Sequence, residues 1–188
     1  KTTGRTFDLL TLGQVLLRLS PPDNDRLSRG DTFVKQVGGA ELNVAVGASL
    51  LGLRTGVISK LPSHDIGSFM KGKIRSFGVS DDFFMYDQSP AARVGIYYYE
   101  NGAYPRKPKV IYDRNHSSFF SLDIDEIPEE VYTASKCFHT TGITLALNED
   151  IRETTIEMIK RFKAAGTLVS FDVNFRGNLW TGDQAREC

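Results

Sequence analysis

Gly38-Gly39-Ala40-Glu41-Leu42-Asn43 is the stretch that decides the fold. Two glycines before a helix let the backbone approach a ligand closely, and the free N–H groups of the first helical turn point outward. A helix that stops at Gly52 is predicted from residues whose spacing is that of one helical face: Leu42, Ala45, Val46, Ser49, Leu50 and Leu53. Asn43 lies off that face, where its amide is free to bind a ligand. A tight turn with a polar first-turn residue explains the same segment without a ligand.

Strands and helices alternate on both sides of this segment. Strands are predicted at Phe7–Leu12, Val15–Leu19, Thr32–Val37, Thr55–Leu61, Cys137–Thr140 and Thr167–Asp172. Further helices are predicted at Asp65–Phe77, at Ile127–Ala134, at Glu149–Ala165 with Asn148 as N-cap, and from Thr181 or Gly182 onward. This alternation predicts an α/β fold, a doubly wound and mostly parallel sheet flanked by helices.

A hairpin interrupts the alternation. Arg93–Glu100 alternates like a strand, Asn101-Gly102 is a hairpin turn signal, and Lys109–Arg114 is a second strand. Because side chains alternate along a strand, Tyr97 and Tyr99 share one face, and so do Tyr112 and Arg114. Tyrosine hydroxyls and an arginine fork suit a polyhydroxylated ligand with a carboxylate, but a solvated hairpin with aromatic pairs remains the alternative. We interpret the hairpin as a small β-lid that stands off the main sheet.

A polar segment follows the last predicted strand. Asp172-Val173-Asn174-Phe175-Arg176 comes at the carboxyl end of a parallel strand, where open α/β sheets bind their ligands. If the strand geometry persists, Asp172, Asn174 and Arg176 project to one side. A polar strand exit that pairs within itself is the alternative.

Composition excludes several classes of protein. The 188 residues are 40% hydrophobic and 24% charged, typical of a soluble globular domain. Lys and Arg number 23, as do Asp and Glu, so no basic excess favours nucleic acid or a membrane surface. No apolar run approaches the ~20 residues of a membrane span, and no signal peptide is expected. Two free cysteines suit the reducing cytoplasm, and three scattered histidines predict no metal site.

These pieces, in this order, resemble the ribokinase-like (PfkB) family of carbohydrate kinases. Gly38-Gly39-Ala40 with Asn43-Val44-Ala45 is similar to the family's N-terminal signature. Other segments resemble the 2-keto-3-deoxygluconate kinase branch: Gly13–Leu19 followed by Pro21-Pro22, Val110–Arg114, Thr141–Thr144, and Asp172–Arg176 with Leu179-Trp180. Gln14 departs from that branch, which commonly has Glu at this position.

The resemblance implies a role for each candidate residue. Gly38, Gly39 and Asn43 are expected to hold substrate hydroxyls, and Tyr97, Tyr112 and Arg114 to reach down from the lid. Ile143 and Arg176 are expected to line the floor, with Asn174 and Arg176 near the transferring phosphate. The lid is expected to comprise segments of about residues 14–37 and 92–115, with homo-oligomer contacts through it left open.

The resemblance also implies what these 188 residues lack. The family's second signature, which carries the catalytic Asp and much of the ATP site, has no match here, so no catalytic residue is expected in this chain and the chain alone is expected to be inactive. The expected reaction is phosphorylation of 2-keto-3-deoxygluconate at its 6-hydroxyl, with ATP and Mg²⁺. A fructokinase, ribokinase or other sugar kinase of the family, and a non-catalytic sugar-binding or regulatory protein, remain alternatives.

Overall fold

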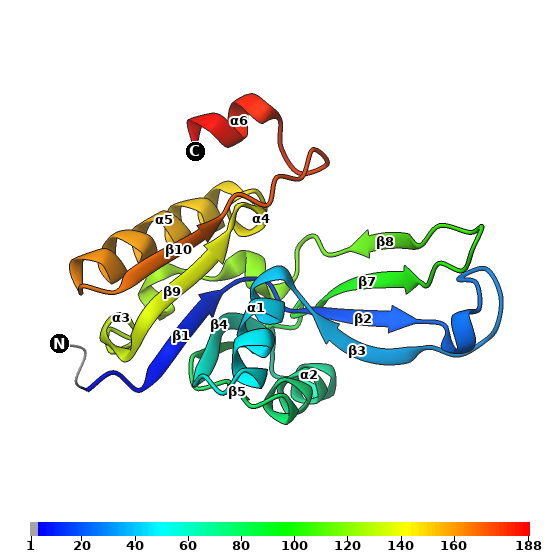
Figure 1. Cartoon of the computed structure of the whole chain (residues 1–188), viewed down its shortest axis with the longest axis horizontal. Helices are drawn as coiled ribbons and strands as arrows, with labels where there is room; N and C mark the ends of the chain where they lie inside the picture. Colours follow the sequence, from blue (N-terminus) through cyan, green and yellow to red (C-terminus); the bar gives the residue numbers. More distant parts are fainter. Residues whose placement is uncertain (1–3) are drawn as a thin grey trace.

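The structure, a computed structural model, describes residues 4–188 and contains two β-sheets (Figure 1). The larger sheet has six strands in the order β10-β9-β1-β4-β5, with β6 also paired to β4, and every neighbouring pair is parallel. Its strands are β1 (Phe7–Leu12), β4 (Thr55–Pro62), β5 (Val79–Ser80), β6 (Phe84–Asp87), β9 (Ser135–Thr141) and β10 (Leu168–Asp172).

Helices cover both faces of this sheet. α1 (Ala40–Leu50) and α2 (Asp65–Ser76) pack on one face, and α3 (Val131–Ala134) and α5 (Glu149–Ala164) pack on the other. The shorter helices are α4 (Gly142–Leu145), α6 (Gly182–Glu187) and the 3₁₀ turns η1 (Pro22–Asn24), η2 (Ser118–Ser121) and η3 (Ile124–Glu126). The predicted doubly wound, mostly parallel fold is therefore confirmed.

Two apolar clusters hold the layers together. Beneath α3 and α5, the rings of Phe138 and Phe162 stack with centroids 4.1 Å apart. Beneath α1 and α2, a second cluster includes Leu42, Val57 and Met70. Burying each such side chain contributes about 1.5–3 kcal/mol, so these clusters hold the helices against the larger sheet.

The second sheet has four strands in the order β3-β2-β7-β8 and extends away from the carboxyl ends of the larger sheet (Figure 1). Its strands are β2 (Leu16–Ser20), β3 (Val34–Gly38), β7 (Gly95–Glu100) and β8 (Lys109–Asp113). Val15, Leu17 and Val94 join the cluster beneath α1 and α2, which anchors the second sheet to the core.

Some local predictions were wrong. Asn101-Gly102 is not the turn of the hairpin: residues 101–108 connect β7 to β8, and the turn lies between the bridged pair Ala103 and Arg106. Arg106 contacts Glu100 at 3.2 Å and thereby ties this longer connection to the end of β7.

The helix predicted at Ile127–Ala134 is also shorter than expected. Only Val131–Ala134 is α-helical, because Ile127 precedes Pro128 and takes the extended conformation that a residue before proline prefers. Leu50, the last residue of α1, and Leu53, which lies beyond that helix, belong to the predicted buried face but are 75% and 46% exposed. The short strands β5 and β6 were not predicted.

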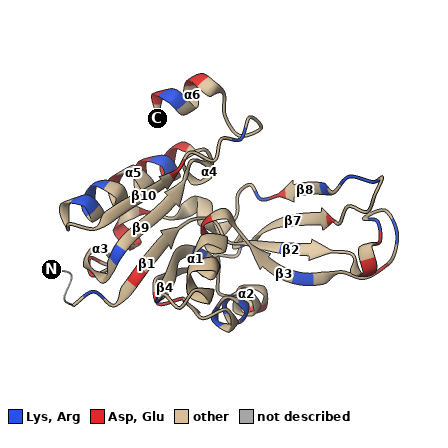
Figure 2. Cartoon of the chain, viewed as in Figure 1, with Lys and Arg blue, Asp and Glu red and all other residues tan. Residues whose placement is uncertain are grey.

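Charges of both signs intersperse over the molecule rather than gathering by sign, as α5 illustrates in Figure 2. Across residues 4–188, every helix is too short or too polar to span a bilayer.

Candidate functional site

The candidate site lies where the winding of the larger sheet reverses. From β1 the chain passes through α1 to β4 on one side, and β9, much later in sequence, pairs with β1 on the other side. Connections leave the carboxyl ends of β1 and β9 in opposite directions, which opens a crevice at that edge. The second sheet stands next to this crevice (Figure 1).

Two adjoining cavities occupy the crevice. One has a volume of about 260 Å³ and is lined by Gln14, Leu16, Gly39, Ala40, Glu41, Asn43, Tyr97, Tyr99, Val110, Tyr112, Arg114, Ile143 and Arg176. The other, of about 420 Å³, is lined by Tyr112, Asp113, Arg114, Asn115, Ile143, Arg176, Asn178 and Leu179. Since they share Tyr112, Arg114, Ile143 and Arg176, we treat them as one cleft.

The glycine turn lets α1 begin at the cleft. Gly39 has a φ of 146°, which side-chain-bearing residues rarely adopt, and a Cβ there would lie 2.7 Å from the backbone oxygen of Gln14. A Cβ on Gly38 would collide with the hydroxyl of Tyr97. Both glycines therefore allow close packing between the turn and the second sheet, while Asn43 stays exposed on the cleft side of α1.

Arg114 is fixed at one end and free at the other. Its Nε donates to Oε1 of Gln14 at 2.8 Å, and Nε2 of Gln14 donates to the backbone oxygen of Arg114 at 3.0 Å and to Oγ of Ser117 at 2.7 Å. Gln14 is only 3% exposed. Burial lowers the pKa of Arg114 from its usual value, but a guanidinium stays protonated in proteins. Within residues 4–188, hydrogen bonds occupy only its Nε, so its Nη atoms can bind an anion.

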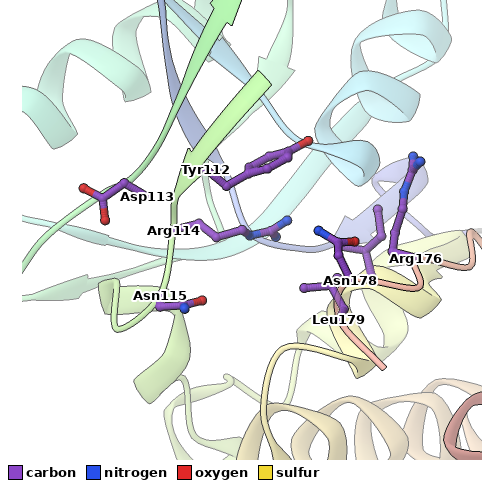
Figure 3. Close-up of a pocket in the computed structure, with 8 residues that line it drawn as sticks. Tyr112, Asp113, Arg114, Asn115, Arg176, Asn178 and Leu179 are labelled. Atoms are coloured by element: carbon purple, nitrogen blue, oxygen red, sulfur yellow. The ribbon is translucent and has the colours of Figure 1, made fainter. Parts of the chain in front are cut away.

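The stick view shows where this fork points. In Figure 3, Arg114 reaches across the cleft and Asn178 points toward it, while Asp113 points away. The Tyr112 ring lies beside the guanidinium, 5.7 Å from its carbon. Tyr97 pairs with Tyr112 across β7 and β8, with ring centroids 5.9 Å apart. Burial raises the pKa of the Tyr97 phenol, which keeps it a hydrogen-bond donor at neutral pH.

Ile143 and Arg176 form the opposite wall. Ile143 lies in α4, where its N–H donates to Oγ1 of Thr141 at 3.2 Å. Arg176 lies in the segment after β10. Strand geometry does not persist through that segment, since β10 ends at Asp172 and Asn174 has a φ of 37°. Asn174 donates its N–H to Asp172 at 2.9 Å and does not line either cavity, so its expected place beside the phosphate stays a prediction.

Sequence reasoning missed Glu41. This residue, the second of α1, is 2% exposed and lines the smaller cavity. Its Oε1 accepts hydrogen bonds from the hydroxyls of Thr141 at 2.6 Å and Thr144 at 2.8 Å. Burial raises the pKa of its carboxyl above the usual value. Its position between Gly39 and Asn43 was the one signal of a role at the site.

Metal ligands do not gather in residues 4–188, where no three His, Cys, Asp or Glu side chains approach closely enough to hold an ion. The cleft instead offers hydroxyl, amide and guanidinium groups.

A doubly wound fold with such a cleft at its switch point is the architecture of a protein that binds a small polar ligand. The particular family follows from comparison: residues 6–188 match the model of the pfkB family of carbohydrate kinases, and the chain belongs to that family.

Named relatives agree with this assignment. The chain is 38% identical over 182 residues to 2-dehydro-3-deoxygalactonokinase from Haloferax volcanii, covering 97% of this chain and 56% of that protein. It is 31% identical over 181 residues to 2-dehydro-3-deoxygluconokinase from Bacillus subtilis, covering 95% and 54%. The crystal structure of 2-dehydro-3-deoxygluconokinase from Thermotoga maritima superposes with a TM-score of 0.90 at 35% identity, covering 96% and 55%. The chain thus spans about half the length of the relatives it matches.

Proposed function

We propose that the complete protein phosphorylates a sugar acid, converting 2-keto-3-deoxygluconate to its 6-phosphate with ATP as donor. The observation that carries this proposal is the presence of two arginines, Arg114 and Arg176, in the lining of a cleft otherwise rich in hydroxyl and amide groups. The names of the relatives, kinases of two 2-keto-3-deoxy sugar acids, support the same substrate class.

Each wall of the cleft would bind a different part of the acceptor. Gly39 and Asn43, which line the smaller cavity, and the neighbouring Gly38 would hold hydroxyls, with Tyr97 and Tyr112 of the second sheet in the same lining. Arg114 is placed to pair with the carboxylate. Ile143 and Arg176 close the opposite wall, where Arg176 can approach either the charged end of the acceptor or the transferring phosphate.

Charge explains why a sugar acid fits this cleft better than a neutral sugar. The guanidinium of Arg114 is partly removed from water, and its Nη atoms depend on a ligand for a strong partner. A hydrogen bond to a charged group contributes about 1.5–3 kcal/mol, whereas a neutral hexose would leave the arginine without an anionic partner. A carboxylate satisfies the fork in a bidentate manner.

ATP and Mg²⁺ are expected because the family consists of carbohydrate kinases. Within residues 4–188, no three His, Cys, Asp or Glu side chains gather to hold a metal ion, and Asn174, expected near the transferring phosphate, does not line the cleft. When bound, ATP supplies the phosphoryl group. This chain's residues would position the acceptor and exclude water, while the base that takes the hydroxyl proton would be an Asp beyond residue 188.

Other features remain proposals of the same kind. We expect segments 14–37 and 92–115, which contain the second sheet, to act as a lid that closes over the acceptor. A homo-oligomer through that sheet and a cytoplasmic location also stay predictions.

A substrate panel tests the proposed function. The complete protein, supplied with ATP and Mg²⁺, is assayed for kcat/KM on 2-keto-3-deoxygluconate, fructose and ribose, and the product is identified by NMR. We expect the keto-acid to be preferred and phosphorylated at its 6-hydroxyl. A preference for fructose or ribose would assign the protein to another sugar kinase of the family, and binding without turnover would make it a sugar-binding protein.

A further inference from the structure

Glu41 is an acid in a cavity whose other charged lining residues are arginines. Asp113 lines only the larger cavity, points away from the cleft (Figure 3) and pairs with Arg93 at 2.8 Å. Of the residues that line the smaller cavity within the described chain, Glu41 is the only acidic one, and it shares the lining with Arg114 and Arg176. At 2% exposure it has little access to water, which makes an ionised carboxylate costly unless a cation compensates it.

The fold needs an acceptor oxygen at Glu41 but does not need its charge. Oε1 accepts from the hydroxyls of Thr141 and Thr144, and these bonds join the start of α1 to the β9–α4 turn. Oε2 packs against Gly13, where a Cβ would collide with the carboxyl group. A glutamine oxygen could accept the same two bonds in the same space, so these bonds do not explain why an ionisable carboxyl stands here.

Arg114 supplies that explanation. Burial raises the pKa of the Glu41 carboxyl, whereas the hydroxyls of Thr141 and Thr144 and the guanidinium of Arg114 in the same lining oppose that rise. Glu41 in turn favours the charged form of Arg114. The remaining groups that face Glu41 carry no charge at neutral pH: Thr141 and Thr144 from β9 and α4, Gln14 after β1, and Tyr97 from β7. Arg176 completes the lining from the segment after β10. Two arginines and one ionised glutamate give the lining one net positive charge; protonation of Glu41 gives it two.

We propose that Glu41 is the internal counter-ion of the cleft, a positioning residue that sets the preference between anionic and neutral acceptors by limiting the positive charge that the acceptor meets. The proposal rests on the proposed function and refines it. Glu41 transfers no proton and contacts no reacting atom; it acts through Arg114. Its charge moderates anion binding in the cleft, which favours release of an anionic product.

Glu41→Gln in the complete protein tests the proposal, because it removes the charge and keeps the shape. Calorimetry measures Kd for 2-keto-3-deoxygluconate and for fructose at pH 8. We expect the affinity for the keto-acid to rise about ten-fold relative to fructose, the size expected when repulsion between two like charges several Å apart in a partly buried site is removed. If Glu41 had only a structural role, the variant would bind both ligands more weakly by the same factor, and the ratio of their Kd values would not change. That result would overturn the proposal.

The wild-type protein provides a second test that needs no variant. Burial raises the pKa of Glu41, so lowering the pH protonates it while the acceptor's carboxylate is still ionised. The preference for keto-acid over fructose should therefore increase toward acid pH in the wild-type protein and stay flat in Glu41→Gln. A preference that does not change with pH in the wild-type protein would contradict the proposal even if the variant proved unstable.

Glu126→Gln is the matched control, since Glu126 is a salt-bridged carboxylate that pairs with Lys60 at 2.7 Å and lines neither cavity. Glu126→Gln should leave unchanged the ratio of the affinities for keto-acid and fructose, and the pH dependence of that ratio. Failure of the wild-type protein to bind any sugar acid would overturn the proposed function; binding by the wild-type protein with no shift in Glu41→Gln would overturn only the role of Glu41.

Discussion

Arg114 owes its orientation to Gln14, a residue that departs from the pattern of the branch it resembles. The amide of Gln14 uses both ends: its oxygen accepts from Nε of Arg114, and its nitrogen donates to the backbone of Arg114 and to Ser117. A glutamate could not make both donated bonds. The amide therefore fixes the side chain without neutralising its charge, which leaves that charge available to a ligand.

Replacing Arg114 by alanine in the complete protein should weaken binding of the sugar acid much more than binding of a neutral sugar. Loss of a charge-assisted pair costs about 2 kcal/mol, which corresponds to roughly a 30-fold rise in KM for 2-keto-3-deoxygluconate. The measurement is KM for the keto-acid beside KM for fructose. An unchanged KM for the keto-acid would show that Arg114 does not bind the acceptor.

Gly39→Ala should destabilise the protein by roughly 1–3 kcal/mol, because the φ of 146° suits glycine and a Cβ would press on Gln14. Gly47→Ala is the matched control in the same helix: a Cβ there meets open space, and alanine should stabilise α1 by about 0.5–1 kcal/mol. Urea denaturation measures both. Equal effects of the two substitutions would argue against a constrained turn at Gly39.

At the scale of single residues, the sequence identified the motifs but not every contact that their side chains make. The Gly38-Gly39 turn and Asn43 stand out because glycines before a helix let a ligand approach the backbone, and both Asn43 and Arg114 line the smaller cavity. Glu41 could not be recognised, because its burial depends on Thr141 and Thr144, about a hundred residues away. Their roles toward a ligand stay predictions.

Helix α5 shows how well local signals define an element. It runs from Glu149 to Ala164, one residue shorter than predicted, and the side chain of Asn148 accepts the N–H of Ile151 at 2.8 Å. Acidic residues at its start and basic residues near its end suit the helix dipole. Its cap, charge pattern and apolar stripe all indicate the same helix.

Asn148→Ala should therefore cost about 1 kcal/mol of stability, since it removes the N-cap bond. The free energy of unfolding in urea measures this loss, with Asn101→Ala as a control at a loop asparagine that caps no helix. A loss no greater than that of the control would mean that the cap contributes little.

Elements defined by distant contacts escaped prediction. β6 has four residues and exists because it pairs with β4, and the turn between β7 and β8 is displaced to residues 103–106. Asn101-Gly102 has the composition of a tight turn, yet Arg106 bonds back to Glu100 and to the backbone of Asn24, which favours the longer connection. Short-range patterns carry no information about such partners.

At the scale of the whole molecule, β10 presents a largely uncovered surface. Leu168 is 69% exposed and Phe171 46%, and beyond the strand Val173 and Phe175 are 61% and 49% exposed. Contiguous apolar surface of this kind favours association. We expect the 188-residue chain by itself to self-associate and to bind a hydrophobic dye, as measured by light scattering and dye fluorescence. A monomer that melts cooperatively without binding the dye would refute this expectation.

The arrangement of the two sheets gives the cleft its chemistry. The larger sheet brings the ends of β1, β9 and β10 to one edge, and the second sheet adds Tyr97, Tyr112 and Arg114 from the opposite side. The alternation of strands and helices predicted the first arrangement, since parallel strands require crossover helices. How closely the second sheet approaches that edge was beyond prediction, because it depends on packing of Val15 and Val94 against the core.

A crystal structure of the complete protein with 2-keto-3-deoxygluconate tests the central claim most directly. The account predicts the carboxylate within hydrogen-bond distance of Arg114 or Arg176, with sugar hydroxyls on Asn43 and the Gly39 turn. A keto-acid bound elsewhere, or bound in the cleft with its carboxylate turned away from both arginines, would contradict it.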